Sequence, residues 1–152
     1  MTRIAVDGID CAGKTTLADA LARLIQATRV SVDDYLRPVE DRYRRGAESP
    51  EGYFLDSFDY ARFREAVLGV EGAVVADGVF LQRPELDDLW TVRIWIEIGF
   101  EQALERAVVR DAGKMSDVRG RYERRYWPGQ QLYIDAVDPR SRADIVVDGA
   151  RA

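Results

Sequence analysis

Residues 8–15 read Gly-Ile-Asp-Cys-Ala-Gly-Lys-Thr, and this stretch decides the fold. It fits the pattern G-x-x-x-x-G-K-S/T at every fixed position. A short apolar, β-branched run at residues 3–6 precedes it, which predicts a buried strand. Apolar residues then recur at helical spacing from about residue 13 to residue 27, which predicts a helix. A strand, a glycine-rich turn and a helix in this order predict a phosphate-binding loop.

The residue types of this loop suit a nucleoside triphosphate. Glycines let the backbone turn tightly, so that successive amides point at phosphate oxygens, and the helix N-terminus adds a partial positive charge. Lys14 would reach the β- and γ-phosphates, and the Thr15 hydroxyl would ligate Mg²⁺. We therefore expect ATP and Mg²⁺ as cofactors, although such loops also serve GTPases, ATPases and motors. The expected nucleotide site comprises Gly8, Asp10, Cys11, Ala12, Gly13, Lys14, Thr15 and Thr16.

The rest of the chain alternates between strand and helix patterns. The strands are nearly all apolar, which is typical of a parallel sheet covered on both faces. We predict one α/β domain over residues 1–152, a P-loop NTPase fold with about five parallel strands flanked by helices. Further strands are expected at 29–32, 73–76, 92–98 and 143–147, and helices at 59–68, 84–89, 101–110 and 118–133 (interrupted around 128–129), with an exposed loop at 35–52.

Composition excludes several classes of function. The chain of 152 residues has no histidine and one cysteine, so His-dependent triads, His-ligated metals and cysteine-rich zinc sites are ruled out. A net charge of −5 argues against non-specific nucleic-acid binding. No apolar run approaches the roughly 20 residues of a membrane span, and the chain enters its first strand without room for a signal peptide. These features favour a cytoplasmic protein without a nucleic-acid or membrane partner; its oligomeric state is left open.

Acidic residues follow three predicted strands, at Asp7, Asp33 and Asp77. In open parallel sheets the ligand lies beyond the carboxyl ends of the strands, where all three would stand. Asp7 is the weaker candidate and is expected to shape the loop or to bind a water near the metal. Asp77 follows an apolar strand, as do acids that hold magnesium or its water in P-loop enzymes; the alternative is an ordinary Asp-Gly turn. Asp33 follows the next strand after the P-loop helix and is the best candidate for the base that accepts a substrate hydroxyl's proton. Metal ligation and a structural cap are the alternatives for Asp33.

An arginine-rich segment stands out in this acidic chain. Residues 106–125 hold seven basic residues against three acidic ones. Arginine forks stabilise the charge that develops on a phosphoryl group in transfer, and a mobile lid would exclude water. We therefore predict a lid at about residues 106–127. The alternative is a solvated helix whose glutamates pair with the arginines.

Together these residues resemble the uridine kinase/phosphoribulokinase-like family of P-loop small-molecule kinases. The resemblance implies that Asp33 is the catalytic aspartate, that Asp77 is the magnesium-linked acid and that Arg110 is a lid arginine. It also places Arg121 and Arg125 near the bound substrate or phosphates. The matching stretches are Lys-Thr-Thr at 14–16, Val-Asp-Asp-Tyr-Leu-Arg-Pro at 32–38, Asp-Ser-Phe-Asp at 56–59, Val-Ala-Asp-Gly-Val-Phe at 75–80 and Arg-Asp at 110–111.

The sequence departs from uridine kinases proper where the acceptor would bind. Those enzymes carry an insertion with an aromatic residue and a histidine that read the base, whereas here only residues 60–72 fill that gap. The ribose-binding aspartate expected upstream is replaced near residues 53–54. Candidate walls of the acceptor pocket, each equally suited to core or surface packing, include Tyr35, Arg37, Tyr53 and Phe58.

The predicted function is ATP-dependent phosphorylation of a hydroxyl on a small, nucleoside-like molecule. Its expected catalytic residues are Asp33, Lys14, Arg110 and Arg121, with Thr15, Asp77 and Asp33 at the metal. One alternative is a nucleoside monophosphate kinase, in which Arg121 or Arg125 binds the acceptor phosphate. Another is a regulatory protein that binds a nucleotide and transfers no phosphate.

Overall fold

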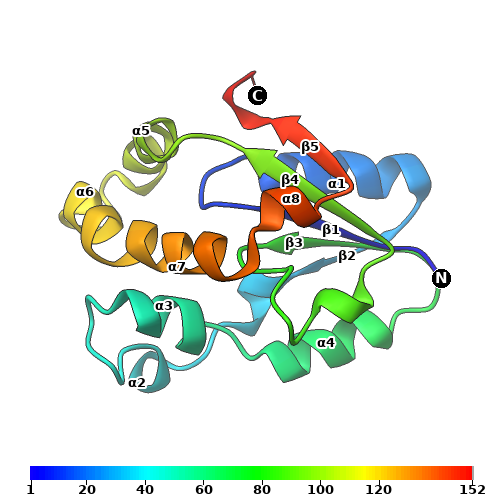
Figure 1. The fold of residues 1–152 in the computed structure, drawn as a ribbon, viewed down its shortest axis with the longest axis horizontal. Coiled ribbons are helices and arrows are strands. Elements are labelled where there is room, and N and C mark those ends of the chain that lie inside the picture. The colour runs from blue at the N-terminus through cyan, green and yellow to red at the C-terminus, as the bar shows by residue number, and fades with distance from the viewer. Residues whose placement is uncertain (152) are drawn as a thin grey trace.

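A five-stranded sheet lies at the centre of the computed structural model, which describes residues 1–151 (Figure 1). Its strand order is β2-β3-β1-β4-β5, and every neighbouring pair is parallel. The predicted parallel α/β sheet is thereby confirmed. The strands are β1 (Arg3–Gly8), β2 (Thr28–Ser31), β3 (Val74–Gly78), β4 (Val92–Glu97) and β5 (Ile145–Asp148).

The core follows from the apolar strands. Every residue of β3 is buried, and the last four residues of β1 are buried with it. By contrast, Ile145 and Val146 of the edge strand β5 are exposed. A parallel strand covered on both faces has no solvent side, so it needs apolar residues at nearly every position. The centre of the sheet therefore carries the core, and its acidic exceptions Asp7 and Asp77 call for a local explanation.

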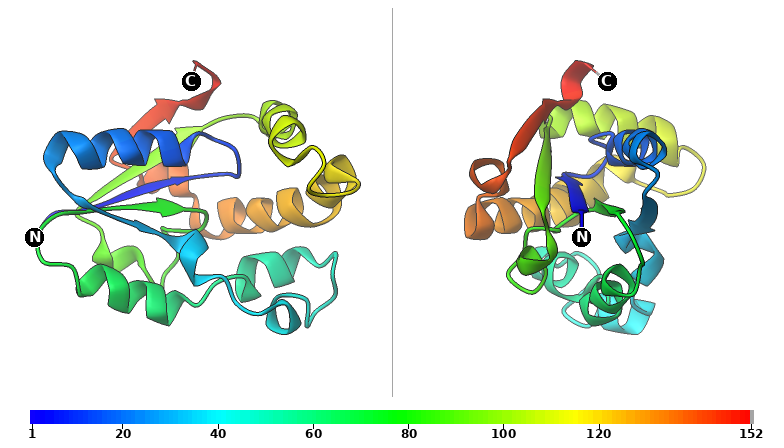
Figure 2. Two further views of the ribbon diagram at one scale, coloured as in Figure 1. Left: turned by 180° about the vertical axis from the view of Figure 1, so that it is seen from behind. Right: turned by 90° about the vertical axis from the view of Figure 1, so that its right-hand side faces the viewer.

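Helices cover both faces of the sheet. Helix α1 packs on β1, β2 and β3, whereas α8 packs on β4 from the opposite face (Figure 2). None of the described helices combines the length and the hydrophobicity needed to cross a bilayer. The helices are α1 (Lys14–Ile25), α2 (Val39–Arg42), α3 (Pro50–Asp56), α4 (Tyr60–Leu68), α5 (Phe100–Asp111), α6 (Val118–Arg121), α7 (Trp127–Val137) and α8 (Pro139–Arg142), with short 3₁₀ turns η1 (Val32–Tyr35), η2 (Asp87–Leu89) and η4 (Gly149–Arg151) and a π-helical turn η3 (Tyr122–Tyr126).

Two of the sequence-based expectations were wrong. The segment 35–52 is not a plain loop, because it holds α2 and the start of α3. Helix α3 begins with Ser49 accepting a hydrogen bond from the Gly52 amide at 3.0 Å and with Pro50 in the first turn. Serine at the cap and proline just inside are ordinary helix-start signals, here hidden among other Pro and Gly residues.

The expected interruption near residues 128–129 is also absent. The chain continues from η3 directly into α7, and Pro128 stands in the first turn of that helix. The Trp127 amide still donates to the Tyr122 carbonyl, so helical hydrogen bonding continues up to the residue before this proline. The irregularity lies upstream instead, in the π-helical turn, a feature that often marks functional sites.

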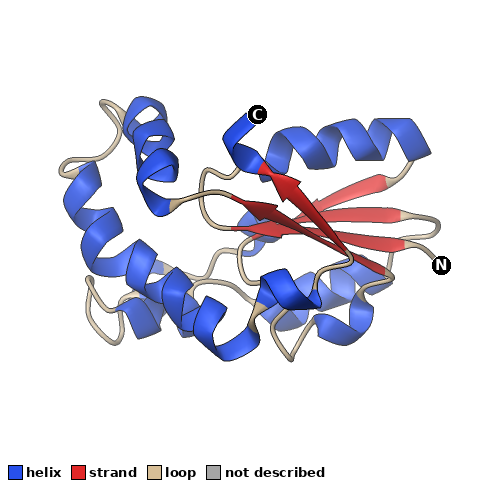
Figure 3. Ribbon diagram, turned by 45° about the horizontal axis from the view of Figure 1, so that its top comes forward, coloured by secondary structure: helices blue, strands red, loops and turns tan. Residues whose placement is uncertain are grey.

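The strand order places the site. β1 lies between β3 and β4, so the order of strands reverses beside it, and ligands bind at such switch points beyond the carboxyl ends of the strands. All five strands point toward the same side of the molecule, where α5, α6 and the start of α7 lie (Figure 1 and Figure 3). The loop after β1 therefore opens between the sheet and these helices.

Candidate active site

The loop between β1 and α1 has the backbone of a phosphate cradle. Cys11 and Gly13 both adopt left-handed conformations, with φ of 61° and 100°. At Gly8 a Cβ would lie 3.1 Å from the Ile96 carbonyl oxygen, so a side chain there would crowd β4. Alternating left- and right-handed residues turn successive amides inward, which produces an anion-binding concavity.

Helix α1 presents its N-terminus to this loop. No side chain caps its first turn, and that turn holds no acidic residue. The first amides of the helix therefore keep their hydrogen-bonding capacity for an anion. Lys14 is 9% exposed, and its ammonium donates to the Ile9 carbonyl oxygen at 2.6 Å. This contact holds the lysine across the loop that it is expected to serve.

A cavity of about 460 Å³ opens above the loop. It brings together the expected nucleotide residues other than Gly8, both strand-end acids and two arginines of the predicted lid. Sequence positions more than 90 residues apart therefore meet at one concave surface. Its lining is Asp10, Cys11, Ala12, Gly13, Lys14, Thr15, Thr16, Asp33, Tyr53, Phe58, Asp77, Val79, Arg106 and Arg110.

Asp77 at the end of β3 is held by an arginine of β2. The register pairs Ser31 with Asp77, and Arg29 Nη2 lies 2.6 Å from Asp77 Oδ1. Arg29 also bonds Asp19 of α1 at 2.9 Å. Burial raises the pKa of the Asp77 carboxyl, and the charge of Arg29 opposes that rise. The ion pair with Arg29 and a hydrogen bond with the Ser31 side chain hold the Asp77 carboxylate at the wall of the cavity.

The donors in the cavity fit magnesium bound together with a nucleotide. Thr15, Asp33 and Asp77 offer only oxygen, the ligand type that this ion prefers. Within residues 1–151 no group of three or more acidic, His or Cys side chains could hold a metal alone. That pattern is expected for Mg²⁺, which keeps several waters and is bound through one or two side chains plus substrate phosphates.

Asp33 stands where two cavities meet. It lies in η1, where Ser31 Oγ accepts a hydrogen bond from its amide at 3.4 Å. It lines the 460 Å³ cavity and also an adjoining pocket of about 360 Å³. Reduced solvation raises the pKa of Asp33, the nearby carboxylates of Asp77 and Asp10 raise it further, and Lys14 opposes both effects. A carboxylate with a raised pKa is a better proton acceptor than an ordinary aspartate.

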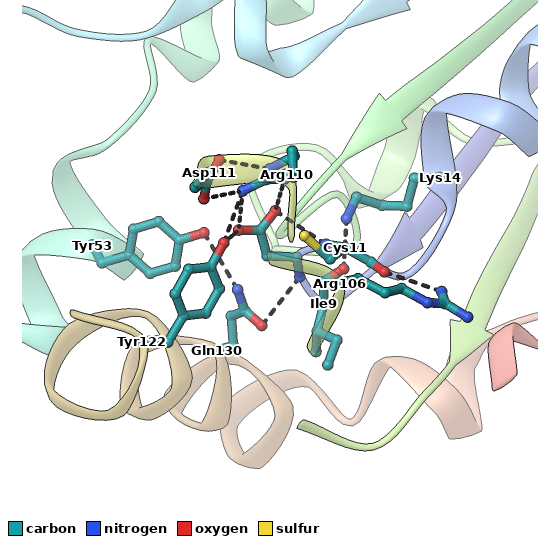
Figure 4. A network of polar contacts seen from close by, with 10 residues as sticks. Ile9, Cys11, Lys14, Tyr53, Arg106, Arg110, Asp111, Tyr122 and Gln130 are labelled. Atoms are coloured by element: carbon teal, nitrogen blue, oxygen red, sulfur yellow. Dashed lines mark hydrogen bonds and ion pairs between the residues drawn. The ribbon is translucent and has the colours of Figure 1, made fainter. Parts of the chain in front are cut away.

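Asp10 of the loop is the centre of a polar network that reaches the predicted lid. Figure 4 shows three other members of this network, Arg110, Tyr122 and Gln130. Its carboxylate accepts a hydrogen bond from the Tyr122 hydroxyl and contacts the Arg110 guanidinium at 3.4 and 3.5 Å. Arg110 also donates to Tyr122 at 2.8 Å and is paired with Asp111 at 2.9 Å. Burial raises the pKa of Asp10, but the charges of Lys14 and Arg110 outweigh it, so the net pKa is lowered.

Two further side chains, Arg106 and Gln130, connect the helices to the loop. Arg106 of α5 donates to the Cys11 carbonyl at 3.2 Å and to the Gly149 carbonyl at 2.7 Å. Gln130 of α7 accepts from the Asp10 amide at 3.3 Å and donates to the Tyr53 hydroxyl at 3.4 Å. The segment from α5 to α7 is thus docked against the P-loop by side chains of α5, η3 and α7.

The remaining arginines of the segment serve other contacts. Arg121 donates to the hydroxyls of Tyr43 and Tyr126 at 3.0 and 3.2 Å. Arg125 is 2% exposed and donates to main-chain carbonyls of the 42–49 segment. Arg119 and Arg124 form ion pairs with carboxylates at the surface, as a solvated helix would.

The expected acceptor residues divide into two groups. Tyr53, Phe58 and Arg125 line the 360 Å³ pocket. Tyr35 instead packs edge-on against Phe63, with ring centroids 5.7 Å apart, and Tyr35, Arg37 and Arg121 line neither cavity. The full lining of the second pocket is Asp10, Asp33, Leu36, Arg42, Tyr43, Tyr53, Ser57, Phe58, Arg110, Asp111, Met115, Tyr122, Arg125 and Tyr126.

Sequence reasoning did not find several residues that shape this site. The sequence places Arg29 only within a predicted strand, and no local pattern indicates its ion pair with Asp77. Tyr122 and Gln130 contact Asp10 across more than a hundred residues of sequence. The one available signal for Tyr122 was its place inside the arginine-rich segment.

Comparison with known proteins supports the fold at low sequence identity. No family model matches the chain, and no curated protein matches it. Several solved structures, however, match the chain. A protein described as a possible uridine kinase from Bacillus stearothermophilus superposes with a TM-score of 0.75 at 20% identity, over 97% of this chain and 88% of that one.

Two other solved structures extend the comparison. A gluconokinase from Sinorhizobium meliloti has a TM-score of 0.64 at 21% identity, over 98% and 83% of the two chains. A shikimate kinase from Acinetobacter baumannii has a TM-score of 0.59 at 17% identity, over 97% and 83%. The chain therefore has the fold of the P-loop small-molecule kinases, in agreement with the motifs of its sequence.

Proposed function

We propose that this chain is an ATP- and Mg²⁺-dependent kinase that transfers the γ-phosphate to a hydroxyl of a small molecule. One observation carries the proposal: Asp33 lies at the junction of the P-loop cavity and the adjoining 360 Å³ pocket. A donor in the first cavity and an acceptor in the second would meet beside a carboxylate of raised pKa. The kinase folds found by comparison are consistent with this chemistry.

The donor would be held by the loop and α1. The inward amides and the helix N-terminus bind the phosphates, and Lys14 neutralises the β- and γ-phosphate oxygens. Thr15 and Asp77 are the residues that would hold Mg²⁺, directly or through water. When bound, this ion neutralises charge on the phosphates and orients them for in-line attack.

Asp33 would act on the acceptor. Its carboxylate takes the hydroxyl proton while the acceptor oxygen forms a bond to the γ-phosphorus and the bond from that phosphorus to the β,γ-bridging oxygen breaks. The products are a phosphate ester and ADP, with the proton on Asp33. Positioned bases of this kind contribute roughly 10²–10⁴-fold to rate. If Asp33 binds the metal instead of accepting the proton, replacement of Asp33 should change the affinity for Mg²⁺.

The segment at about residues 106–127 would act as the lid. Arg106 and Arg110 already line the P-loop cavity, so these two, rather than Arg121, are the arginines placed to stabilise charge in transfer. In the structure Arg110 is held by Asp10 and Asp111. A bound triphosphate offers Arg110 a competing anion, so nucleotide binding would redistribute this network.

A second candidate is a nucleoside monophosphate kinase, which the arginines bordering the 360 Å³ pocket favour. In that case the acceptor atom is a phosphate oxygen and needs no base, since it is already ionised near neutral pH. Replacement of Asp33 would then leave the rate of transfer nearly unchanged. The regulatory alternative predicts nucleotide binding without transfer to any acceptor.

The test is ADP formation in a screen of nucleosides, nucleoside monophosphates, sugars and other hydroxylated metabolites. We expect an acceptor whose phosphorylation is abolished by Lys14→Ala. Asp33→Asn should lower kcat by roughly 10²–10⁴-fold and keep ATP affinity within a few-fold. The matched control is Asp34→Asn, since Asp34 is exposed and lines neither cavity. Normal turnover in Asp33→Asn, or ATP binding without ADP formation from any acceptor, would contradict the proposal.

A further inference from the structure

Three arginines gather around one tyrosine at the 360 Å³ pocket. The guanidinium carbons of Arg42, Arg121 and Arg125 lie 5.4, 6.0 and 4.9 Å from the centroid of the Tyr43 ring. They come from the end of α2, from α6 and from η3. Arg42, Tyr43 and Arg125 line the pocket itself, and Arg121 donates to the Tyr43 hydroxyl at 3.0 Å.

No carboxylate of residues 1–151 forms an ion pair with any of these three arginines. Their neighbours differ: Arg44 and Arg45 pair with Asp56, and Arg124 pairs with Glu48 and Asp117. The difference matters because a cation removed from water without an anion costs free energy, and folded chains ordinarily provide the partner.

The contacts that these arginines do make leave their charge uncompensated. Arg125 donates to the carbonyls of Arg42, Gly46 and Ser49, which are neutral acceptors. Arg121 reaches two neutral hydroxyls, and its Nε is buried without a hydrogen-bond partner. The cluster therefore holds hydrogen-bonding capacity as well as charge.

The titration behaviour of the cluster agrees with this excess of positive charge. Burial alone would raise the pKa of Tyr43, but the hydrogen bond from Arg121 and the charges of the three arginines lower it. Burial lowers the pKa of Arg125, and the like charge of Arg121 lowers it further. A bound anion would relieve both the repulsion and the unpaired donors.

Charge is unevenly arranged along the pocket. Asp10, Asp33 and Arg110 are shared with the P-loop cavity, and Arg110 is paired with Asp10 and with Asp111 of the second pocket. Asp33 is therefore the carboxylate that remains without an ion pair, among the described residues, where the two cavities meet. Arg42, Tyr43 and Arg125 line only the second pocket. A molecule that places a hydroxyl at Asp33 and an anionic group beside Tyr43 would match both parts.

We infer that the pocket is an acceptor site for a hydroxylated molecule that also carries a phosphate or carboxylate group, held by Arg42 beside Tyr43. Arg121 lies outside the pocket lining and adds its charge next to the Tyr43 hydroxyl that it contacts. This inference rests on the proposed kinase function. Guanidinium forks recognise either anion through charge-assisted hydrogen bonds. Arg125 supports the site indirectly, because its own donors hold the main chain of the 42–49 segment.

The test uses small anions that any pocket of this size admits. The protein is first saturated with a non-hydrolysable ATP analogue and Mg²⁺, so that the P-loop is occupied. Inorganic phosphate and acetate are then titrated by calorimetry at constant ionic strength. We expect one further anion site, weakened about tenfold or more by Arg42→Gln and by Arg121→Gln. Arg44→Gln is the matched control, since Arg44 is exposed, ion-paired and outside the pocket lining.

Each outcome has one meaning. Binding of phosphate alone indicates a phosphorylated acceptor, and binding of acetate indicates a carboxylate; both support the inference if the two glutamine variants lose it. The inference is overturned if neither phosphate nor acetate binds, or if the two glutamine variants bind as tightly as the wild type. The measurement needs no turnover, so an arginine-dependent anion site in a protein that forms no ADP would refute the kinase alone. Phosphorylation of a neutral acceptor without any anion site would refute the inference alone.

Discussion

The buried carboxylate of Asp7, which precedes the P-loop, should make the free energy of unfolding depend on pH. Asp7 has no exposed surface, accepts a hydrogen bond from the Gly8 amide at 2.9 Å and another from the Tyr133 hydroxyl at 2.5 Å. Burial raises its pKa from 3.8 to about 6, although these bonds and the charge of Lys14 oppose the rise. Asp7 thus connects the start of the loop to α7, and its contribution to the free energy of unfolding depends on pH.

The direction of this pH dependence follows from the pKa values of Asp7 in the folded and unfolded states. The folded protein binds the Asp7 proton more tightly than the unfolded chain, so the associated stability is fully present below pH 3.8 and is lost as the pH rises through about 6. One pKa unit corresponds to about 1.4 kcal/mol, so the whole loss is about 3 kcal/mol. Of this, about 2.4 kcal/mol falls between pH 4 and pH 7.

The assay is urea unfolding of the wild type and Asp7→Asn from pH 4 to pH 8. Asparagine keeps the size and removes the titration, and any change in hydrogen bonding is independent of pH. The free energy of unfolding of the variant minus that of the wild type should therefore rise by about 2.4 kcal/mol from pH 4 to pH 7. A difference that stays constant within about 0.5 kcal/mol, or that falls with pH, would refute the reasoning.

Two further substitutions test the packing around the site and the core. Tyr122→Phe removes the hydroxyl that donates to Asp10 and accepts from Arg110, so we expect a loss of about 1–3 kcal/mol in the free energy of unfolding by urea; an unchanged value would show that this network does not fasten the lid segment. Phe63→Ala empties a fully buried position between Tyr35 and Trp90 and should cost about 3–5 kcal/mol, measured in the same way; a loss below 1 kcal/mol would contradict the close packing seen there.

Much of the fold could be predicted because its signals are local. Most of the strands contain short apolar runs, although β2 (Thr28–Ser31) does not, and the P-loop motif specifies a strand before it and a helix after it. Asp33 and Asp77 could be placed together because parallel strands end at one edge of a sheet. The structure adds that Asp33 borders two cavities, which no pattern in the sequence states.

The parts that could not be predicted depend on contacts distant in sequence. Arg29 reaches Asp77 across 48 residues, and Tyr122 reaches Asp10 across 112. Within the arginine-rich segment, identical residues take different roles because consecutive positions of a helical turn face different directions. Arg124 consequently faces carboxylates at the surface while Arg125 is buried under the 42–49 segment.

The measurement that tests the central claim most directly is transfer of label from [γ-³²P]ATP. Wild-type protein with Mg²⁺ and a fractionated pool of small metabolites should move the label into an organic phosphate ester. The transfer should be lost in Lys14→Ala, lowered roughly 10²–10⁴-fold in Asp33→Asn and kept in Asp34→Asn. Label that stays in ATP, or that appears only as inorganic phosphate with every metabolite fraction, would contradict the assignment of this site as a kinase centre.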